Sequence, residues 1–141
     1  MDGAIKRIER AVGAYIAARY RDVVEVGIGR NTTAAETIAA AGVRVRAVDI
    51  RPVDAGPIPF FRDDIFAPDP HIYRGADLIY AVRPGVEMVP ALIALARRCG
   101  CDLLVYHLGD EVYLGGGERI ACDGVVLHRY HRPSGAGSEE G

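Results

Sequence analysis

The stretch VVEVGIGRNTTAAETIAAAGVRVRAVD, residues 23–49, decides the fold of this chain of 141 residues. It opens on an apolar run, residues 23–26, whose β-branched valines suit a buried strand. Gly27 and Gly29 follow, and two glycines at this spacing permit a tight turn where a ligand can approach the backbone. The first half of the stretch therefore predicts a strand followed by a ligand-binding turn.

The second half of the stretch predicts a helix and another strand. Residues 31–33, Asn-Thr-Thr, offer side chains that cap a helix, which we expect over residues 34–41 with its end at Gly42. Residues 43–48 then form an apolar strand that ends in Asp49. A strand, a glycine turn, a helix and a second strand with a terminal acid make up the nucleotide-binding half of a Rossmann-like fold.

The glycine turn distinguishes between two cofactors. A dinucleotide fingerprint has glycine or alanine where this chain has Thr32, so the sequence disfavours NAD, which stays the alternative ligand. Glu25 completes the run Glu-Val-Gly-Ile-Gly, which resembles motif I of the class I S-adenosylmethionine-dependent methyltransferases. The resemblance implies S-adenosylmethionine as cofactor, with Glu25 facing its cationic methionine end and Gly27 and Gly29 cradling it. Asn31 replaces the third glycine of that motif and tolerates left-handed backbone geometry.

Acids follow the second and third predicted strands. The carboxylate of Asp49 can accept hydrogen bonds from both ribose hydroxyls of an adenosyl group, or Asp49 can be a turn residue. A Pro- and Gly-rich connection over residues 51–59 excludes regular structure, and a short strand is expected over 58–62. The methyltransferase resemblance then implies that Asp63 or Asp64 accepts a hydrogen bond from the adenine amino group.

Two later strands end in candidate catalytic residues. A buried strand predicted over residues 75–82 precedes Arg83, whose guanidinium can bind a carboxylate or phosphate in the cleft, or pair with Glu87. After the next predicted strand, His107 can act as a general base near neutral pH or be a hydrogen-bonded structural residue. Carboxyl ends of parallel strands meet at one edge of a sheet, so these candidates and the acids should share one rim.

Composition excludes several classes of function. The net charge is −2 and the isoelectric point is about 6.1, so bulk electrostatic binding of nucleic acid or of an anionic membrane is not indicated. Neither a membrane-spanning apolar stretch nor a secretory signal is present, and we expect a cytoplasmic protein. Cys99, Cys101 and Cys122 are expected to be reduced thiols, and because their spacing matches no common zinc motif we expect no metal.

The remaining segments complete an α/β domain. Apolar residues at steps of three and four predict an amphipathic helix over residues 3–20, with Glu9 among the polar residues largely outside its buried stripe. The dipeptide at 123–124, Asp-Gly, predicts a C-terminal β-hairpin. We therefore expect a doubly wound, mostly parallel, Rossmann-like sheet of the methyltransferase type over residues 1–131, and a disordered tail over 132–141.

Over residues 1–131 the chain also resembles a family of small uncharacterised archaeal proteins, through Glu-Val-Gly-Ile-Gly, the acid after the second strand and the Arg-Pro after the fourth. The resemblance implies a trimmed methyltransferase-type domain without an established activity. Three functions fit: an S-adenosylmethionine-binding protein that acts as a methyltransferase, a non-catalytic NAD- or nucleotide-binding regulatory module, and a scaffold with a degenerate site. Because no inserted or appended domain is available for a substrate, we expect methyl transfer to need a small substrate, or a protein partner or second copy of the chain that completes the site.

Overall fold

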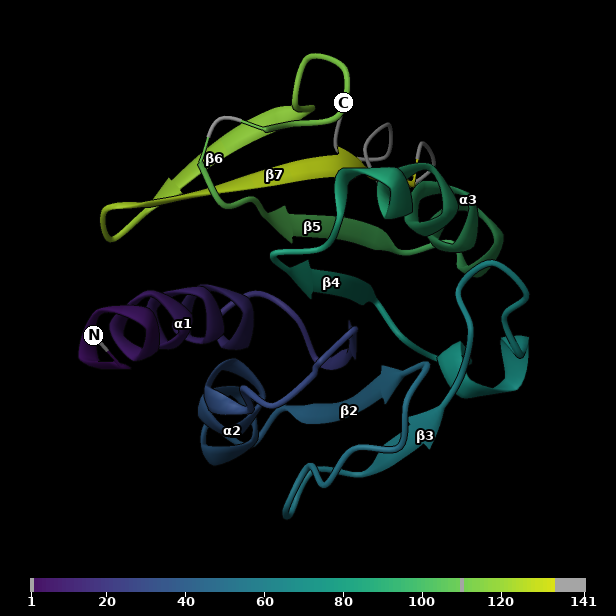
Figure 1. Cartoon of the computed structure of the whole chain (residues 1–141), viewed down its shortest axis with the longest axis horizontal. Helices are drawn as coiled ribbons and strands as arrows, with labels where there is room; N and C mark the ends of the chain where they lie inside the picture. Colours follow the sequence, from purple (N-terminus) through teal and green to yellow (C-terminus); the bar gives the residue numbers. More distant parts are fainter. Residues whose placement is uncertain (1, 110, 134–141) are drawn as a thin grey trace.

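A seven-stranded sheet forms the centre of the computed structural model, which describes residues 2–109 and 111–133 (Figure 1). The strand order is β3-β2-β1-β4-β5-β7-β6. The first five strands in this order are parallel, and β7 runs antiparallel to both β5 and β6. The expected mostly parallel, doubly wound α/β sheet with a C-terminal hairpin is confirmed. The strands are β1 (Asp22–Val26), β2 (Arg44–Asp49), β3 (Phe60–Arg62), β4 (Leu78–Val82), β5 (Asp102–Tyr106), β6 (Glu118–Cys122) and β7 (Val125–His131).

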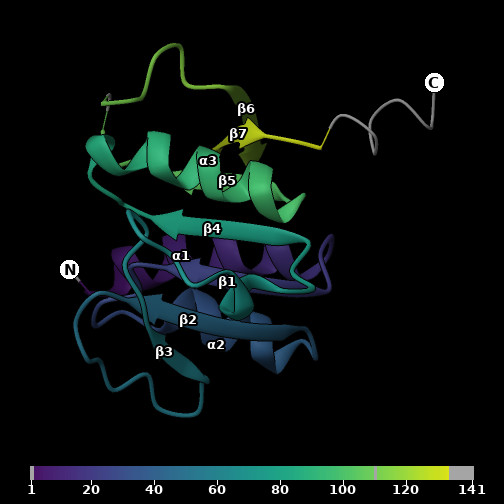
Figure 2. The same cartoon turned by 90° about the vertical axis from the view of Figure 1, so that its right-hand side faces the viewer.

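Helices cover both faces of this sheet. Figure 2 views the sheet from the side of α3, and α1 and α2 lie behind it. None of the helices within the described residues is long and apolar enough to cross a membrane. The helical elements are α1 (Asp2–Ala17), α2 (Thr33–Ala40), η1 (Pro70–Tyr73), η2 (Val86–Met88) and α3 (Val89–Cys99).

Apolar residues of the sheet pack into two separate cores, one on each face. Successive side chains of a strand point to opposite faces. On β4, Leu78 accordingly packs with α1 and α2, whereas Ile79 packs with Leu92 and Leu95 of α3. Burial on both faces explains why the central strands are almost continuously apolar.

Several elements are shorter than predicted, for local reasons. The fourth strand begins at Leu78 rather than at residue 75, because Gly75 has a φ of 85° and residues 75–77 turn into the sheet. The first helix ends at Ala17 and the third strand begins at Phe60, two residues later than expected. Of the predicted tail, residues 134–141 lie outside the described part of the chain.

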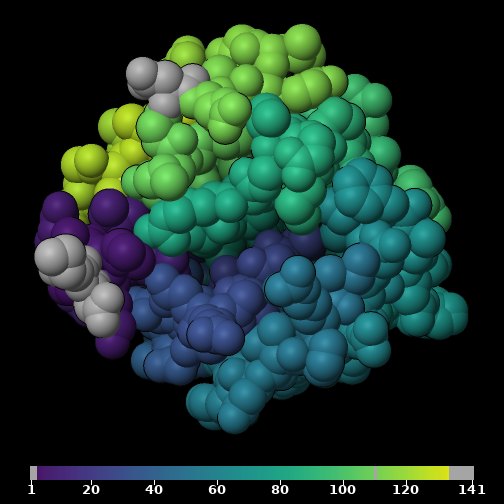
Figure 3. Space-filling model, viewed as in Figure 1, coloured from purple at the N-terminus to yellow at the C-terminus, as the bar shows by residue number. Residues whose placement is uncertain are grey.

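The chain changes direction across the sheet between β1 and β4. From β1 it proceeds through β2 to the edge strand β3, then returns to place β4 on the other side of β1. In open α/β sheets, ligands bind beyond the carboxyl ends of the strands at such a switch point. Figure 3 shows a hollow on the surface between the blue segment that follows β1 and the teal segment that follows β4.

Charged side chains also gather at the opposite, amino-terminal ends of the strands. Arg46 is buried, forms an ion pair with Asp22, and donates to the carbonyls of Ile72 and Arg74 at 2.7 and 3.1 Å. Asp77 accepts a hydrogen bond from the backbone N–H of Asp22 at 3.0 Å. These contacts fasten the segment around η1 to β1 and β2, and a cavity of about 420 Å³ lies beside it, between η1 and the end of α3.

Gly13 allows α1 and α2 to approach closely. A β-carbon at this position would meet the Ala34 carbonyl oxygen and the Thr37 Cβ, each at 2.8 Å. We predict that Gly13→Ala lowers the free energy of unfolding by about 1–3 kcal/mol, because the two helices must separate. Urea denaturation measures this change. Gly3→Ala on the same helix is the control: a β-carbon there meets no atom within 4 Å, so no loss is expected, and equal losses would contradict the packing argument.

Candidate functional site

The carboxyl ends of the central strands border a cavity of about 330 Å³. Its walls combine apolar side chains with carboxylates, a composition typical of sites for small organic ligands. The hollow in Figure 3 lies at this end of the sheet. The lining residues are Val26, Gly27, Val48, Asp49, Ile50, Asp63, Asp64, Ile65, Phe66, Glu87 and Met88.

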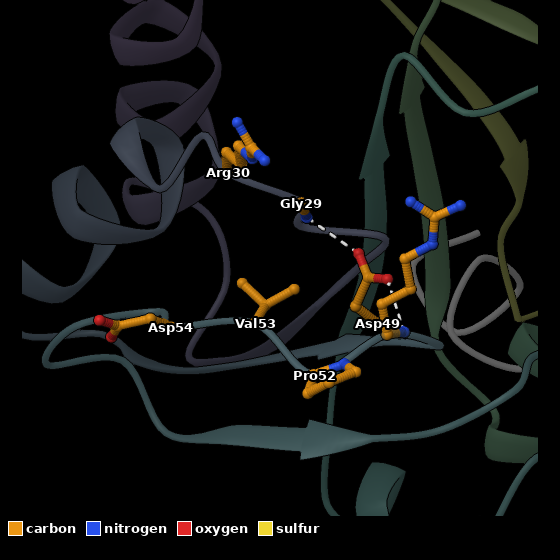
Figure 4. Close-up of a pocket in the computed structure, with 7 residues that line it drawn as sticks. Gly29, Arg30, Asp49, Pro52, Val53 and Asp54 are labelled. Carbon is orange, nitrogen blue, oxygen red and sulfur yellow. Dashed lines mark hydrogen bonds between the residues drawn. The ribbon is translucent and has the colours of Figure 1, made fainter.

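Asp49 holds the glycine turn in place. Its Oδ2 accepts a hydrogen bond from the backbone N–H of Gly29 at 2.9 Å, and its Oδ1 accepts one from that of Arg51 at 3.0 Å (Figure 4). The turn itself needs glycine, since φ is 74° at Gly27 and 55° at Gly29. A carboxylate offers about four lone-pair sites, so each oxygen of Asp49 can accept a further bond from a ligand. Asp49 therefore acts as a turn residue, one of the two roles considered from the sequence. It also lines the cavity in which the other role, a contact to a ribose, would take place.

A second cavity, of about 540 Å³, lies on the outer side of Asp49. Figure 4 shows its walls, which come from the glycine turn on one side and from the Pro-rich connection after β2 on the other. Asp49 is the residue that the linings of both cavities share. The outer cavity is lined by Gly29, Arg30, Asp49, Arg51, Pro52, Val53 and Asp54.

The two acids after β3 differ in their hydrogen bonds. Asp63 is engaged within the protein: Oδ1 accepts from the Asp69 N–H at 3.1 Å, and Oδ2 accepts from the Tyr73 hydroxyl at 2.7 Å. Asp64 accepts from the Phe66 N–H through Oδ1. Both acids line the inner cavity, and Asp64, which uses only one oxygen in this way, keeps more accepting capacity for a ligand than Asp63.

Glu25 is buried at the end of β1. It is 1% exposed, and its Oε1 accepts a hydrogen bond from the Tyr80 hydroxyl at 2.8 Å. The pKa of Glu25 is raised to about 8: burial is the main cause and the nearby Glu9 carboxylate adds to it, while the Tyr80 hydrogen bond and Arg83 act in the opposite direction. At neutral pH the Glu25 carboxyl is therefore mostly protonated.

Glu9 and Arg83 connect α1 to the end of β4. The Arg83 guanidinium donates to Glu9 Oε2 at 2.7 Å, and the Asn31 side chain donates to the same oxygen at 2.7 Å. Arg83 thus pairs with Glu9 rather than with Glu87, so the surface pair considered from the sequence is wrong. The expectation that Glu9 lies outside the buried stripe is also wrong, because its side chain is 1% exposed.

His107 belongs to a cluster of aromatic rings beyond the end of β5. Its Nε2 lies 2.7 Å from the Tyr130 hydroxyl, and its ring contacts that of His128 edge-on, with centroids 5.1 Å apart. Burial, followed by the proximity of His128, lowers the pKa of His107, so the imidazole is neutral at neutral pH. A cavity of about 230 Å³ is lined by His107, Arg83 and Glu111, among others. These contacts agree with His107 as a hydrogen-bonded structural residue. A neutral imidazole can also accept a proton, so a role as general base stays a prediction.

The sequence-predicted residues therefore gather in three places along one edge. Gly27, Asp49, Asp63 and Asp64 border the inner cavity, and Gly29 borders the outer one. Glu25, Asn31 and Arg83 meet Glu9, and His107 lies farther along, beyond β5.

Sequence reasoning missed Glu9, Tyr80 and Tyr130. For Glu9 a signal exists, since it stands three and seven residues before the buried Val12 and Ile16 of the same helix face.

Cysteines contribute no cluster to this edge. Cys99, Cys101 and Cys122 are free thiols in the structure. Residues 2–109 and 111–133 contain no group of three or more His, Cys, Asp or Glu side chains arranged to hold a metal ion.

The amino-acid sequence is similar to those of a known protein family. The sequence matches the uncharacterised protein family UPF0146 over residues 8–123. It is 43% identical to a UPF0146 protein of Archaeoglobus fulgidus over 102 residues, which cover 70% of this chain and 78% of the relative. It is 38% identical to a UPF0146 protein of Halobacterium salinarum over 101 residues, which cover 71% and 78% of the two chains. The expected resemblance to a family of small uncharacterised archaeal proteins is confirmed.

Solved structures with a similar fold are class I methyltransferases. An RNA methyltransferase from Salinibacter ruber, solved in complex with S-adenosyl-L-homocysteine, has a TM-score of 0.58 at 13% identity and covers 93% of this chain and 92% of its own. An S-adenosyl-L-methionine methyl transferase from Silicibacter pomeroyi has a TM-score of 0.52 at 17% identity, with coverage of 89% and 91%. At these identities the likeness establishes the methyltransferase-type fold.

The buried Glu25 predicts a pH dependence of stability. In the unfolded chain its carboxyl ionises near 4.5, whereas in the folded chain it ionises near 8. Between these values the folded state binds more protons than the unfolded state, so this group makes stability fall as pH rises. We predict that Glu25→Gln loses less stability than the wild type between about pH 5 and about pH 8, as urea denaturation would show. The exposed Glu36→Gln is the control and should keep the wild-type slope; the same slope in Glu25→Gln would contradict this prediction.

Proposed function

This chain belongs to the UPF0146 family, and we propose that it binds S-adenosylmethionine at the carboxyl ends of β1, β2 and β4. One observation carries the proposal: Asp49, at the end of β2, both orders the glycine turn and faces a cavity of about 330 Å³. Lone pairs left on its two oxygens can accept hydrogen bonds from the two hydroxyls of a ribose.

The rest of the inner cavity suits an adenine ring. Ile50, Ile65, Phe66 and Met88 supply apolar walls, and Phe66 is 65% exposed, so much of its side chain is available to contact a ligand. Asp64 lies on the same lining and offers a carboxylate to an amino group on the ring. This pattern of apolar walls with a few polar groups supports an adenosyl ligand.

Acid groups around the glycine turn favour S-adenosylmethionine over NAD. NAD would place a pyrophosphate beside the turn, and the carboxyl groups of Glu25 and Glu9 both lie near it. A pyrophosphate gains nothing from a protonated Glu25 and a Glu9 already paired with Arg83, whereas a cationic group can take the place of the Glu25 proton. Thr32 replaces the third glycine of the dinucleotide fingerprint; it stands at the N-cap position of α2, where its side chain makes no capping hydrogen bond to the backbone and instead donates to Glu36.

We further propose methyl transfer as the activity. S-adenosylmethionine supplies a methyl group on a positively charged sulfur, which a nucleophile on a second substrate can accept. The cavity of about 230 Å³ beside Arg83 and His107 is our candidate pocket for that substrate. There Arg83 could hold an anionic group, and the neutral imidazole of His107 could take up the proton that the nucleophile releases. This pocket, at about 230 Å³, is smaller than the inner cavity of about 330 Å³, so we expect a partner protein or a second copy of the chain to complete it.

Isothermal titration calorimetry of the purified protein against S-adenosylmethionine, S-adenosylhomocysteine, NAD and NADH tests the cofactor. We expect micromolar binding of the first two and none of the others, because only the first two avoid a pyrophosphate at the acidic turn. Preference for NAD would instead indicate a nucleotide-binding regulatory module. Binding of none of the four would leave the scaffold as the better interpretation.

Asp49→Ala tests the ribose contact. We predict that this variant binds S-adenosylhomocysteine about 10- to 100-fold more weakly, because two hydrogen bonds to a charged acceptor are lost. Asp54→Ala is the matched control: it removes a carboxylate of the outer cavity alone and should bind as the wild type does. An unchanged circular dichroism spectrum shows that Asp49→Ala is folded, and unchanged affinity in that folded variant would remove the ribose role.

A further inference from the structure

Glu9 has a buried carboxylate oxygen without a partner. Its Oε2 accepts hydrogen bonds from Asn31 and Arg83, each at 2.7 Å. Its Oε1 is buried and has no hydrogen-bond partner within residues 2–109 and 111–133. A buried carboxylate oxygen that accepts no hydrogen bond is costly and rare, so the cluster lacks a donor at this point.

Charges around Glu9 define what kind of donor would fit. Glu25 lies close enough for the Glu9 charge to raise its pKa, and Tyr80 is bonded to Glu25 as a neutral phenol. Arg83 faces both carboxyl groups and is already paired with Glu9 Oε2. In the free protein at neutral pH the proton on Glu25 keeps this group of side chains from carrying surplus negative charge. If Glu25 loses that proton, two carboxylates face the single guanidinium of Arg83. A positively charged donor would satisfy both the surplus charge and the unpaired oxygen.

An ammonium group matches this site better than a metal ion. It carries three N–H donors on one charged nitrogen, which suits a pair of carboxylate acceptors. Calcium and magnesium require about six or more oxygen ligands, several of them usually carboxylates or waters in a regular arrangement. This site offers only two carboxyl groups, and each already has a partner: Tyr80 for Glu25 and Arg83 for Glu9. That is too few oxygen ligands for such a metal ion but enough for an ammonium group.

We propose that Glu9 is a ligand-binding residue, whose Oε1 accepts a hydrogen bond from the charged amino group of an amino-acid-type ligand beside Glu25. This inference rests on the proposed function, because S-adenosylmethionine carries such a group at the end opposite its adenine. Gly27 lines the inner cavity, and Asn31, four residues later in the same turn, donates a hydrogen bond to Glu9. A ligand that lies along this turn can therefore reach from the inner cavity to Glu9. The first helix thereby forms part of the binding site.

Arg83 and Asn31 act as positioning residues in this arrangement. Both hold Glu9 Oε2, which leaves Oε1 for the ligand. The protonated Glu25 stabilises the cluster in the free protein, and an incoming ammonium replaces its proton as the compensating positive charge. Binding at neutral pH should therefore release a proton, which calorimetry in two buffers of different ionisation enthalpy detects.

The decisive experiment compares three ligands that differ at one end. Isothermal titration calorimetry is performed on the wild type and Glu9→Gln with S-adenosylmethionine, decarboxylated S-adenosylmethionine and methylthioadenosine, which lacks the whole amino-acid group. We predict that Glu9→Gln weakens the first two by about 10-fold or more and leaves methylthioadenosine unchanged, because an amide is a poorer partner for an ammonium. Glu36→Gln, a neutralised exposed carboxylate on α2, should bind all three as the wild type does.

Each other outcome rejects the inference in a recognisable way. Equal weakening of all three ligands would make Glu9 a structural residue, and no weakening of any would make it irrelevant to binding. Wild-type protein that binds none of the three would reject the proposed function together with this inference. The wild type alone gives an independent reading: decarboxylated S-adenosylmethionine should bind more tightly than methylthioadenosine, and equal affinities would exclude an ammonium subsite even if Glu9→Gln fails to fold.

Discussion

Coverage of the central sheet on both faces is the constraint on which this structure depends. Helices α1 and α2 bury one face and α3 buries the other, so the strands between them are apolar along nearly their whole length. Charged side chains can therefore be accommodated only where the strands end. All the residues to which we assign a role lie at one of these two edges or on a segment that folds over it.

The two edges of the sheet use their charged residues differently. At the amino-terminal edge Arg46 has partners for its guanidinium in Asp22 and in two backbone carbonyls, so its hydrogen-bond network is closed. At the carboxyl-terminal edge Asp49 retains accepting capacity, and one oxygen of Glu9 has no partner among the described residues. Closed networks stabilise a fold, whereas incomplete ones at a switch point are where a ligand gains most by binding.

Local sequence signals were sufficient for the framework of this protein. The alternation of apolar runs with glycine turns predicted the order of strands and helices, and the Asp-Gly dipeptide predicted the hairpin, where φ is 49° at Asp123 and 79° at Gly124. The position of Asp49 at the end of the second strand also followed from the sequence, because it depends on one strand–turn–helix–strand unit. Element ends were less accurate, since their limits depend on single residues such as Gly75 and on packing that a pattern does not contain.

Contacts between distant segments were beyond the reach of such signals. The sequence contains two neighbouring acids after β3, and only the Tyr73 hydroxyl bonded to Asp63 separates their roles. Glu9 and Arg83 are 74 residues apart in the sequence, and their ion pair forms because folding brings α1 close to the end of β4. The sequence by itself determined the fold type and the acid at the end of β2, since both follow from short-range periodicity and turn chemistry. The tertiary structure alone decided which charges are buried together, because burial and electrostatic coupling depend on distances between chain segments that sequence order does not specify.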